Sequence, residues 1–408
     1  MADTELGSDP PLTLDLTTAN GAIRLVKDAF VVPVAATASP SRFSASGVLD
    51  ADGNMVEQSI SWSSSTERVN QDPQKPAEVK RLAGRYIFGG VLYGHFGHFI
   101  VESLARMWAL DAEGVEADGI LFTPKAVGFP EKSVQKLHGL ASLLGARLPF
   151  VVANEPLQVD ELYVPVQGFG MKDLIVGSEA FRGFINKHAG ASIAPEGAEK
   201  LYISRSALPR DRGSILGEYK LEEYLRAEGY DIFHPQRATP EEQIARYKAA
   251  RLIIAEDCSP VHLLGYVGNS NQNVAVVLRR SMTIGAYLAR QLQVFKGMQA
   301  TEIECLVDDW IPMPGARPSR SSWGEIDFGR LQAALLASGH ITGTTPWPSL
   351  TEEERAAELE RVGKMHETTM ESFKEIQAKR QAKVARHDQA GREAQARRDA
   401  KAQKTAGG

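Results

Sequence analysis

Short apolar segments alternate with amphipathic segments of helical length between residues 179 and 300, and this alternation limits the chain to few folds. Strands are expected at 201–204, 230–233, 252–255 and 274–278. Helices are expected at 179–188, 218–228, 240–250, and from about residues 260 and 283 onward. Because parallel strands need helical crossovers, the pattern predicts a doubly wound α/β sheet. Ligands of such sheets bind beyond the carboxyl ends of the strands.

A second α/β region precedes this one. Its strands are expected at 29–35, 85–91, 119–123, 149–152 and 161–164, its helices at 94–110 and 132–144, and a hairpin at 43–62. Since 408 residues exceed what one hydrophobic core usually serves, two globular domains are predicted. The predicted parts are an α/β domain at 20–168, a Rossmann-like domain at 169–310, a linker with a packing helix at 311–350, and a charged tail, helical or partly disordered, at 351–408.

Composition excludes several classes of protein. The net charge of −5 provides no basic field for nucleic acid, so no nucleic-acid partner is predicted. Cys258 and Cys305 are too few for a disulfide framework. The acidic start lacks the features of a signal peptide, and no run of apolar residues reaches the roughly 18 to 20 that a membrane helix needs. A cytoplasmic location is expected, peripheral contact with a membrane is compatible with it, and no oligomeric state is predicted.

The tail changes composition from residue 351 onward. Acidic residues outnumber basic ones eight to four at 352–375, and basic residues outnumber acidic ones nine to three from 376 to the end. A thin apolar stripe fades along it. The tail is therefore interpreted as a solvated helix, with a coiled-coil or partner-binding arm as the alternative.

The sequence GHFGHFIVE at 94–102 is the first candidate site. On a helix, His98, Glu102 and Arg106 would form one polar stripe, with His95 a turn before His98. This arrangement suits general base catalysis on a hydroxyl. Either His98 is the base and Glu102 orients it, or Glu102 is the base. The alternative is a structural helix start with a Glu102–Arg106 surface pair.

The second candidate site has two parts, one on each of two expected strands. Arg205 ends the strand LYIS, and Arg210 and Arg212 follow in a loop; guanidinium groups bind phosphates, although solvated loop arginines are the alternative. The run Glu256-Asp257-Cys258-Ser259-Pro260-Val261-His262 leads from a strand into a helix. Ser259 is expected to cap that helix, whose N–H groups and His262 would face a phosphate, and Cys258 is expected to be a buried structural thiol.

Other patterns are discounted. Asp50-Ala51-Asp52 matches the Asp-x-Asp pattern of metal-dependent transferases, but Gly53-Asn54 beside it indicates a turn. The chain has no Walker sequence, no glycine-rich dinucleotide fingerprint after a strand, and no His/Cys cluster with zinc spacing. No metal and no cofactor are therefore predicted.

Two blocks, GHFGHFIVESLARMWAL and the run from LYISR to AEDCSPVHLLGY, resemble glycosyltransferase family 61, particularly its bacterial members. The resemblance implies a GT-B architecture with two Rossmann-like domains facing a cleft, and metal-independent inverting transfer in capsule or lipopolysaccharide assembly. Many members have His-Gly-Ala where this chain has Asp257-Cys258-Ser259, which is similar to a bacterial variant. The positions that match the family motifs are His98, Glu102, Arg205, Arg212, Ser259 and His262.

The resemblance implies a nucleoside-diphosphate sugar as donor and a glycan or lipid-linked glycan as acceptor. The C-terminal domain would hold the donor, with the arginines and Ser259 near the diphosphate and Glu256 near sugar hydroxyls. The N-terminal domain would present His98 or Glu102, with His95 nearby, to the acceptor. Two rival interpretations are a nucleotide-sugar epimerase and a catalytically degenerate member that binds a glycan or a protein.

Overall fold

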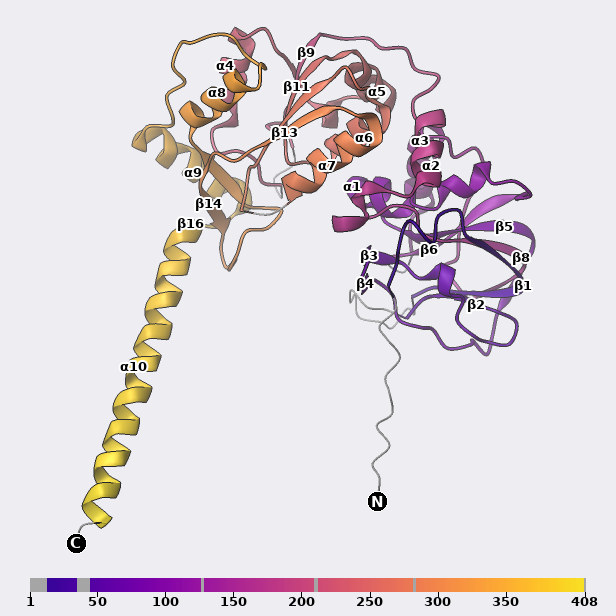
Figure 1. Ribbon diagram of the computed structural model, residues 1–408, viewed down its shortest axis with the longest axis horizontal. Coiled ribbons are helices and arrows are strands. Elements are labelled where there is room, and N and C mark those ends of the chain that lie inside the picture. Colours follow the sequence, from indigo (N-terminus) through magenta and orange to yellow (C-terminus); the bar gives the residue numbers. More distant parts are fainter. Residues whose placement is uncertain (1–12, 35–44, 126–127, 209–211, 282–283, 407–408) are drawn as a thin grey trace. The chain divides into compact units, whose positions relative to one another are not determined.

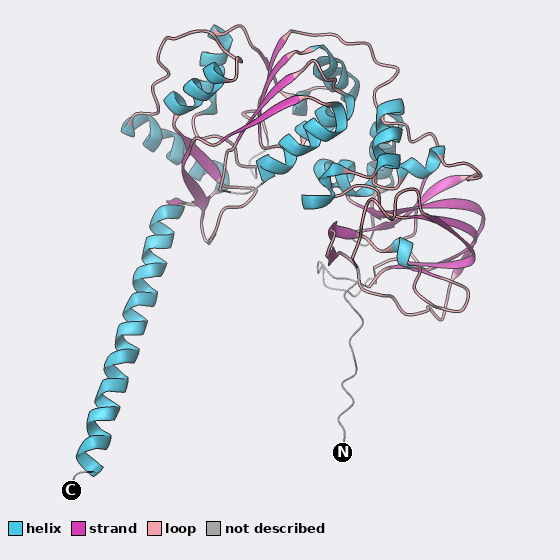
Figure 2. Ribbon diagram, viewed as in Figure 1, coloured by secondary structure: helices cyan, strands magenta, loops and turns pink. Residues whose placement is uncertain are grey.

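The computed structural model describes residues 13–34, 45–125, 128–208, 212–281 and 284–406 (Figure 1). The chain forms two compact units. Unit 1 comprises Met1–Ile203, Arg237–Val276 and Thr283–Glu302, and unit 2 comprises Ser204–Gln236, Val277–Met282 and Ile303–Gly408. Helices and strands are mixed throughout, and parallel strand pairs occur, which confirms the predicted α/β class (Figure 2).

Unit 1 contains a six-stranded mixed sheet with the order β2-β1-β8-β5-β6-β7. The neighbouring strands β8, β5, β6 and β7 run parallel, whereas β1 pairs antiparallel with both β2 and β8. The strands are β1 (Ile23–Val32), β2 (Gly47–Leu49), β5 (Lys80–Leu92), β6 (Gly119–Pro124), β7 (Phe150–Val152) and β8 (Leu157–Pro165). Buried aliphatic side chains, such as Val31, Leu121 and Val159, fill the core on this sheet, because alternate positions of each strand face inward.

Four further strands of unit 1 lie next to one another in the order β9, β11, β12 and β13. They are β9 (Lys200–Ile203), β11 (Leu252–Glu256), β12 (Asn273–Val277) and β13 (Gln299–Ile303), and the interleaved helices are α5 (Pro240–Ala249), α6 (Pro260–Val267) and α7 (Ile284–Lys296). β9 and β11 pair in parallel, as the strand–helix alternation predicts. The helix expected at 240–250 is confirmed as α5, and Thr239 caps it, since its hydroxyl accepts from the Glu242 N–H at 3.2 Å.

The remaining elements of unit 1 are α1 (Phe96–His98), α2 (Glu131–Leu143), α3 (Glu179–His188) and the antiparallel pair β3 (Trp62–Ser64) and β4 (Glu67–Arg68). An aromatic cluster joins α3, α6 and α7. Phe181, Tyr266 and Phe295 contact one another and Phe169, with ring centroids 5.0 to 6.1 Å apart. This cluster fixes α6 within unit 1.

Unit 2 contains a three-stranded antiparallel sheet with the order β15-β14-β16. Its elements are α4 (Glu218–Ala227), β10 (Asp231–Phe233), β14 (Leu306–Pro312), β15 (Trp323–Ile326), α8 (Phe328–Ala337), α9 (Glu352–His366), β16 (Met370–Ser372) and α10 (Phe373–Ala406). The packing helix expected within 311–350 is confirmed as α8, with Asp327 as its cap. Val362 of α9 packs against Leu216 and Trp323, and the three side chains form a buried apolar cluster.

No helix in the described ranges has both the length and the apolar character needed to cross a bilayer. The acidic first twelve residues, Arg210 and Thr283 lie outside the described residues.

Candidate active site

The segment that follows β5 carries the first candidate site. Ser103 ties this segment to the end of β5. Its hydroxyl donates to the Val91 carbonyl at 2.9 Å and accepts from the Tyr93 N–H at 3.0 Å. The single helix predicted at 94–110 is wrong. The segment consists of α1, a π-helical turn at 99–103 and a 3-10 helix at 107–111. Each change of helix type rotates the residues that follow, so the spacing of four no longer aligns Arg106 with His98 and Glu102.

Arg106 departs most from its predicted position. It is 1% exposed, and its guanidinium donates to the carbonyls of Pro165 at 2.9 Å and Ile60 at 2.7 Å. Gly90, with a φ of 89°, makes room for it, because a Cβ there would lie 2.5 Å from the guanidinium. Burial lowers the pKa of Arg106 to about 9. The predicted polar stripe is therefore wrong at Arg106, as is the Glu102–Arg106 surface pair, since Arg106 is a buried structural clamp. The His98–Glu102 part of the stripe is confirmed.

His98 and Glu102 form a close pair. The Nδ1 atom of His98 is hydrogen bonded to Oε2 of Glu102. The histidine side chain is 51% exposed and the glutamate side chain 9% exposed. Because a carboxylate accepts at this oxygen, the bond favours the tautomer of a neutral imidazole that has its proton on Nδ1 and its lone pair on Nε2. The pair thus presents a basic nitrogen from a half-exposed imidazole.

Aromatic rings surround the His98 imidazole. Tyr93 stacks on it with ring centroids 5.3 Å apart, and His95 approaches it edge-on at 5.6 Å. The ammonium of Lys125 lies 6.0 Å from the centre of the Tyr93 ring. His95 precedes α1 and is exposed, so both candidate histidines of this segment face the same region.

Residues from α6, far along the sequence, reach the same segment. A Cβ built on Gly97 would lie 2.5 Å from Oγ and 3.1 Å from Cβ of Ser259, so this glycine permits a close approach. The Tyr266 hydroxyl donates to the Ile100 carbonyl at 3.0 Å. The predicted capping role of Ser259 is wrong, because its backbone is helical and its side chain makes no cap bond. Unit 1 thus brings Ser259 beside Gly97, the residue that precedes His98.

His262 lies in the first turn of α6 and is 6% exposed. Its Nδ1–H donates to Oε1 of Gln291 at 2.7 Å, and the Gln291 amide donates back to the His262 carbonyl at 3.3 Å. The pKa of His262 is lowered to about 4, mainly by burial and to a smaller extent by nearby His98, against the raising effect of the Gln291 bond. His262 is therefore a neutral imidazole at physiological pH. Sequence reasoning missed Gln291, which is fully buried on α7.

The acidic pair lies where β11 ends, as predicted. Glu256 is fully buried and Asp257 is 1% exposed. Cys258 is also buried, which confirms the expectation for this thiol. These residues lead directly into Ser259 and α6. Within unit 1, the carboxyl end of β11 therefore adjoins the segment that carries His95 and His98, which we call the histidine segment.

The arginines of the second candidate site belong to unit 2. The Arg205 N–H donates to Oε1 of Glu218 at 2.7 Å, and its guanidinium donates to the Gly213 carbonyl at 2.8 Å. Arg212 is half-buried in the same loop. Glu218, 3% exposed at the start of α4, also accepts from the Ser204 hydroxyl at 3.1 Å. The loop next to β9 is thus fixed by a buried carboxylate that sequence reasoning did not identify.

The discounted Asp-x-Asp pattern is a turn, as expected. The Asp50 carboxylate accepts from the N–H groups of Asn54 at 2.9 Å and Asp52 at 3.2 Å. The bond from Asn54 is the main reason that the pKa of Asp50 is lowered. In the part of the chain that the structure describes, no three His, Cys, Asp or Glu side chains cluster as metal ligands would.

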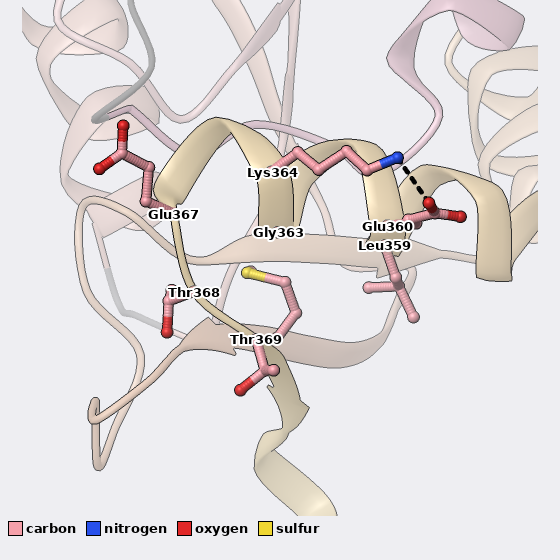
Figure 3. A pocket seen from close by; sticks show the side chains of 8 residues that line it. Leu359, Glu360, Gly363, Lys364, Glu367, Thr368 and Thr369 are labelled. Carbon is pink, nitrogen blue, oxygen red and sulfur yellow. Dashed lines mark hydrogen bonds and ion pairs between the residues drawn. The ribbon is translucent and has the colours of Figure 1, made fainter.

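A groove of about 480 Å³ lies in unit 2, at the end of α9 and the start of β16 (Figure 3). Lys364 and Glu360 form an ion pair at its edge, with 2.5 Å between nitrogen and oxygen. The lining residues are Leu359, Glu360, Gly363, Lys364, Glu367, Thr368, Thr369 and Met370. None of them belongs to the predicted site, and the groove offers no imidazole or guanidinium.

One family model matches a stretch of the chain that contains both the histidine segment and α6. The family model described as Glycosyltransferase 61 matches residues 96–267, somewhat under half of the chain. The match begins at α1 and ends with the last residue of α6. It supports a transferase of the glycosyltransferase class. Within that class it supports family 61. No curated protein matches the chain.

Proposed function

We propose that this chain transfers a sugar from a nucleoside-diphosphate sugar to a hydroxyl of a glycan or lipid-linked glycan, with inversion at the anomeric carbon and without a metal ion. The observation that carries the proposal is the His98–Glu102 pair, which lies inside the segment that matches the family and directly follows Gly97, the residue that Ser259 approaches. A GT-B architecture, the bacterial branch and a role in capsule or lipopolysaccharide assembly belong to the same proposal and are supported by the resemblance of the two sequence blocks.

His98 acts as the general base. Its Nε2 removes the proton of the acceptor hydroxyl while that oxygen attacks the anomeric carbon and the bond from this carbon to the diphosphate breaks. The bonding electrons leave with the diphosphate. Glu102, which is buried and accepts from Nδ1–H, orients the imidazole and stabilises the imidazolium that forms. Glu102 is the less suitable base because its side chain is buried and its carboxylate is already bonded to His98.

The remaining candidates, which belong to both units, are proposed to act on the donor. Arg205 and Arg212 stabilise the charge that develops on the diphosphate, because guanidinium groups offer paired donors to phosphate oxygens. Ser259 and neutral His262 bind donor oxygens near His98. Glu256 binds sugar hydroxyls, for which a carboxylate is a good acceptor. His95 assists at the acceptor side. In domain terms, residues 20–168 serve the acceptor and residues 169–310 the donor.

The test is a thermal-shift screen with nucleoside-diphosphate sugars, followed by transfer assays with each donor that binds. A ligand that binds only the native state raises the melting temperature by mass action. We expect one donor class to raise it, transfer to continue in the presence of a chelator, and the product linkage to have the opposite anomeric configuration to the donor.

Three outcomes would contradict this proposal. If no nucleotide sugar shifts the melting temperature, the chain is a degenerate member of the family. If the donor changes configuration without any acceptor, the chain is an epimerase. If a chelator abolishes transfer and a divalent cation restores it, metal independence is wrong.

A further inference from the structure

The last helix of unit 2, α10, continues far beyond the residues that anchor it. Ile376 is 8% exposed, and the Lys374 N–H donates to Oδ1 of Asp308 at 3.3 Å. Every residue from 377 to 396 is exposed. The helix spans 34 residues, a length of about 50 Å (Figure 1, yellow). More than half of α10, from residue 377 to 396, is therefore exposed to solvent.

Charge is divided unevenly between this helix and the rest of the chain. Residues 376–408 contain nine Lys and Arg against three Asp and Glu, whereas residues 1–375 contain 37 against 48. A basic segment thus ends an otherwise acidic chain. An anionic partner would be attracted by α10 and repelled by the average charge of the remaining residues.

The positive charges of α10 gather on one side of the helix. At about 100° per residue, positions 379, 380, 383 and 386 fall within an arc of about 120°. These positions hold Lys379, Arg380, Lys383 and Arg386, all of them exposed, and we call this set the basic face. Asp388 and Arg392 lie on the opposite side by the same geometry. Lys379 also pairs with Glu371 at 3.3 Å, an exposed pair of small energetic weight.

The sequence repeats this arrangement once. Lys or Arg recurs at 397, 398, 401 and 404, each 18 residues after a member of the basic face. Eighteen residues are five helical turns, about 27 Å, so these positions continue the same line along α10. The four exposed side chains of the basic face lie on one side of a helix, which matches a flat anionic surface better than a partner that wraps around the helix.

The helix has no apolar face that would enter a bilayer or pair with a second helix. Val384, 60% exposed, is the large aliphatic residue of its exposed part, and alanine and glutamine occupy most of the positions between the charges. Interfacial helices that insert need an apolar side, and coiled coils need apolar heptads. Attraction to a surface would therefore rest on charge alone.

We propose that the basic face of α10 binds unit 2 to the surface of an anionic phospholipid membrane by electrostatic attraction. This inference does not depend on the proposed sugar transfer. Each Lys or Arg close to such a surface contributes roughly a fivefold gain in binding, the equivalent of about 1 kcal/mol. The four charges of the basic face together account for a gain of roughly 10²- to 10³-fold.

The experiment is co-sedimentation of the full chain with vesicles of pure phosphatidylcholine and with vesicles that contain one-third phosphatidylglycerol, at low and at high salt. Binding is expected only to the anionic vesicles and only at low salt, because salt screens exposed charges. The combined variant K379Q/R380Q/K383Q/R386Q should bind roughly 10²-fold more weakly or worse. Circular dichroism of each variant checks that the helix is retained.

Two control variants separate the basic face from net charge. The variant R380Q/R386Q/Q381R/Q389R keeps the charge but moves two arginines to the opposite side, and it should lose roughly 25-fold in binding. Arg392→Gln removes one charge from the opposite side and should change binding by less than about twofold. Absence of binding by the wild type, equal binding by the relocated variant, or binding to nucleic acid or an acidic glycan but not to vesicles would each overturn the proposal.

Discussion

Helical spacing predicts the side-chain positions of α10 in unit 2 but not all of those in the histidine segment of unit 1. In the segment at 96–111, tertiary contacts bury Arg106 and interrupt the helix with a π-helical turn. In α10, no side chain from 377 to 396 is buried, and the helix keeps its regular period over its length. Helical periodicity is therefore a good guide to side-chain position where nothing packs on the helix, and a poor one where backbone carbonyls compete for a buried cation.

The largest expected effect on stability concerns Arg106. Arg106→Met removes the donor to the carbonyls of Pro165 and Ile60 and should lower the free energy of unfolding by about 3 to 5 kcal/mol. Urea unfolding followed by tryptophan fluorescence measures it. Arg24→Met, which breaks an exposed pair with Asp50 in the same unit, serves as control and should cost less than about 1 kcal/mol. Equal effects for the two variants would mean that Arg106 is not a structural clamp.

The pH dependence of stability tests the buried position of His262. Because its pKa in the folded chain is about 4, below the unfolded value of 6.5, the unfolded chain binds more protons between these values. The contribution of neutral His262 is thus complete above pH 6.5 and is lost as pH falls towards 4, by up to about 3 kcal/mol. His262→Gln should flatten the profile of unfolding free energy in this window. The same change at exposed His387 should leave the profile as in the wild type.

Gly97 tests the close approach of α6 to the histidine segment. Gly97→Ala would place a Cβ 2.5 Å from Oγ and 3.1 Å from Cβ of Ser259, and the second contact cannot be relieved by rotating the hydroxyl. A loss of about 1 to 3 kcal/mol in the free energy of unfolding is expected. Ser259→Gly in the same chain removes both atoms and should restore most of the loss. If Gly97→Ala alone is neutral, the two segments are not in contact.

Gly391 gives the matching test in α10 and the smallest effect. It is exposed, and a Cβ there would meet nothing within 4 Å. Gly391→Ala should increase the helical content, because alanine favours the interior of a helix by about 1 kcal/mol over glycine. Circular dichroism measures the change. The same substitution is therefore expected to destabilise the histidine segment and to stabilise α10, and a loss of helicity at Gly391→Ala would contradict the contrast between the two regions.

Local signals predicted much of the fold. The strands at 201–204, 252–255 and 274–278 and the helix capped by Thr239 follow from apolar runs and capping residues, which act over a few positions. The site was predicted in part. His98 and Glu102 are neighbours in sequence and in space, whereas Gln291 gives no sequence signal because its contact with His262 joins two helices.

The central claim is that His98 removes the proton of the acceptor hydroxyl and that Glu102 orients the His98 imidazole. The kcat of single variants tests this claim most directly. With the donor and acceptor found by screening, His98→Ala should lower kcat by about 10²-fold or more. Glu102→Gln keeps an acceptor oxygen for Nδ1–H and should lower kcat less than His98→Ala does. Full activity in both variants would contradict the account, and a larger loss for Glu102→Gln than for His98→Ala would make Glu102 the base.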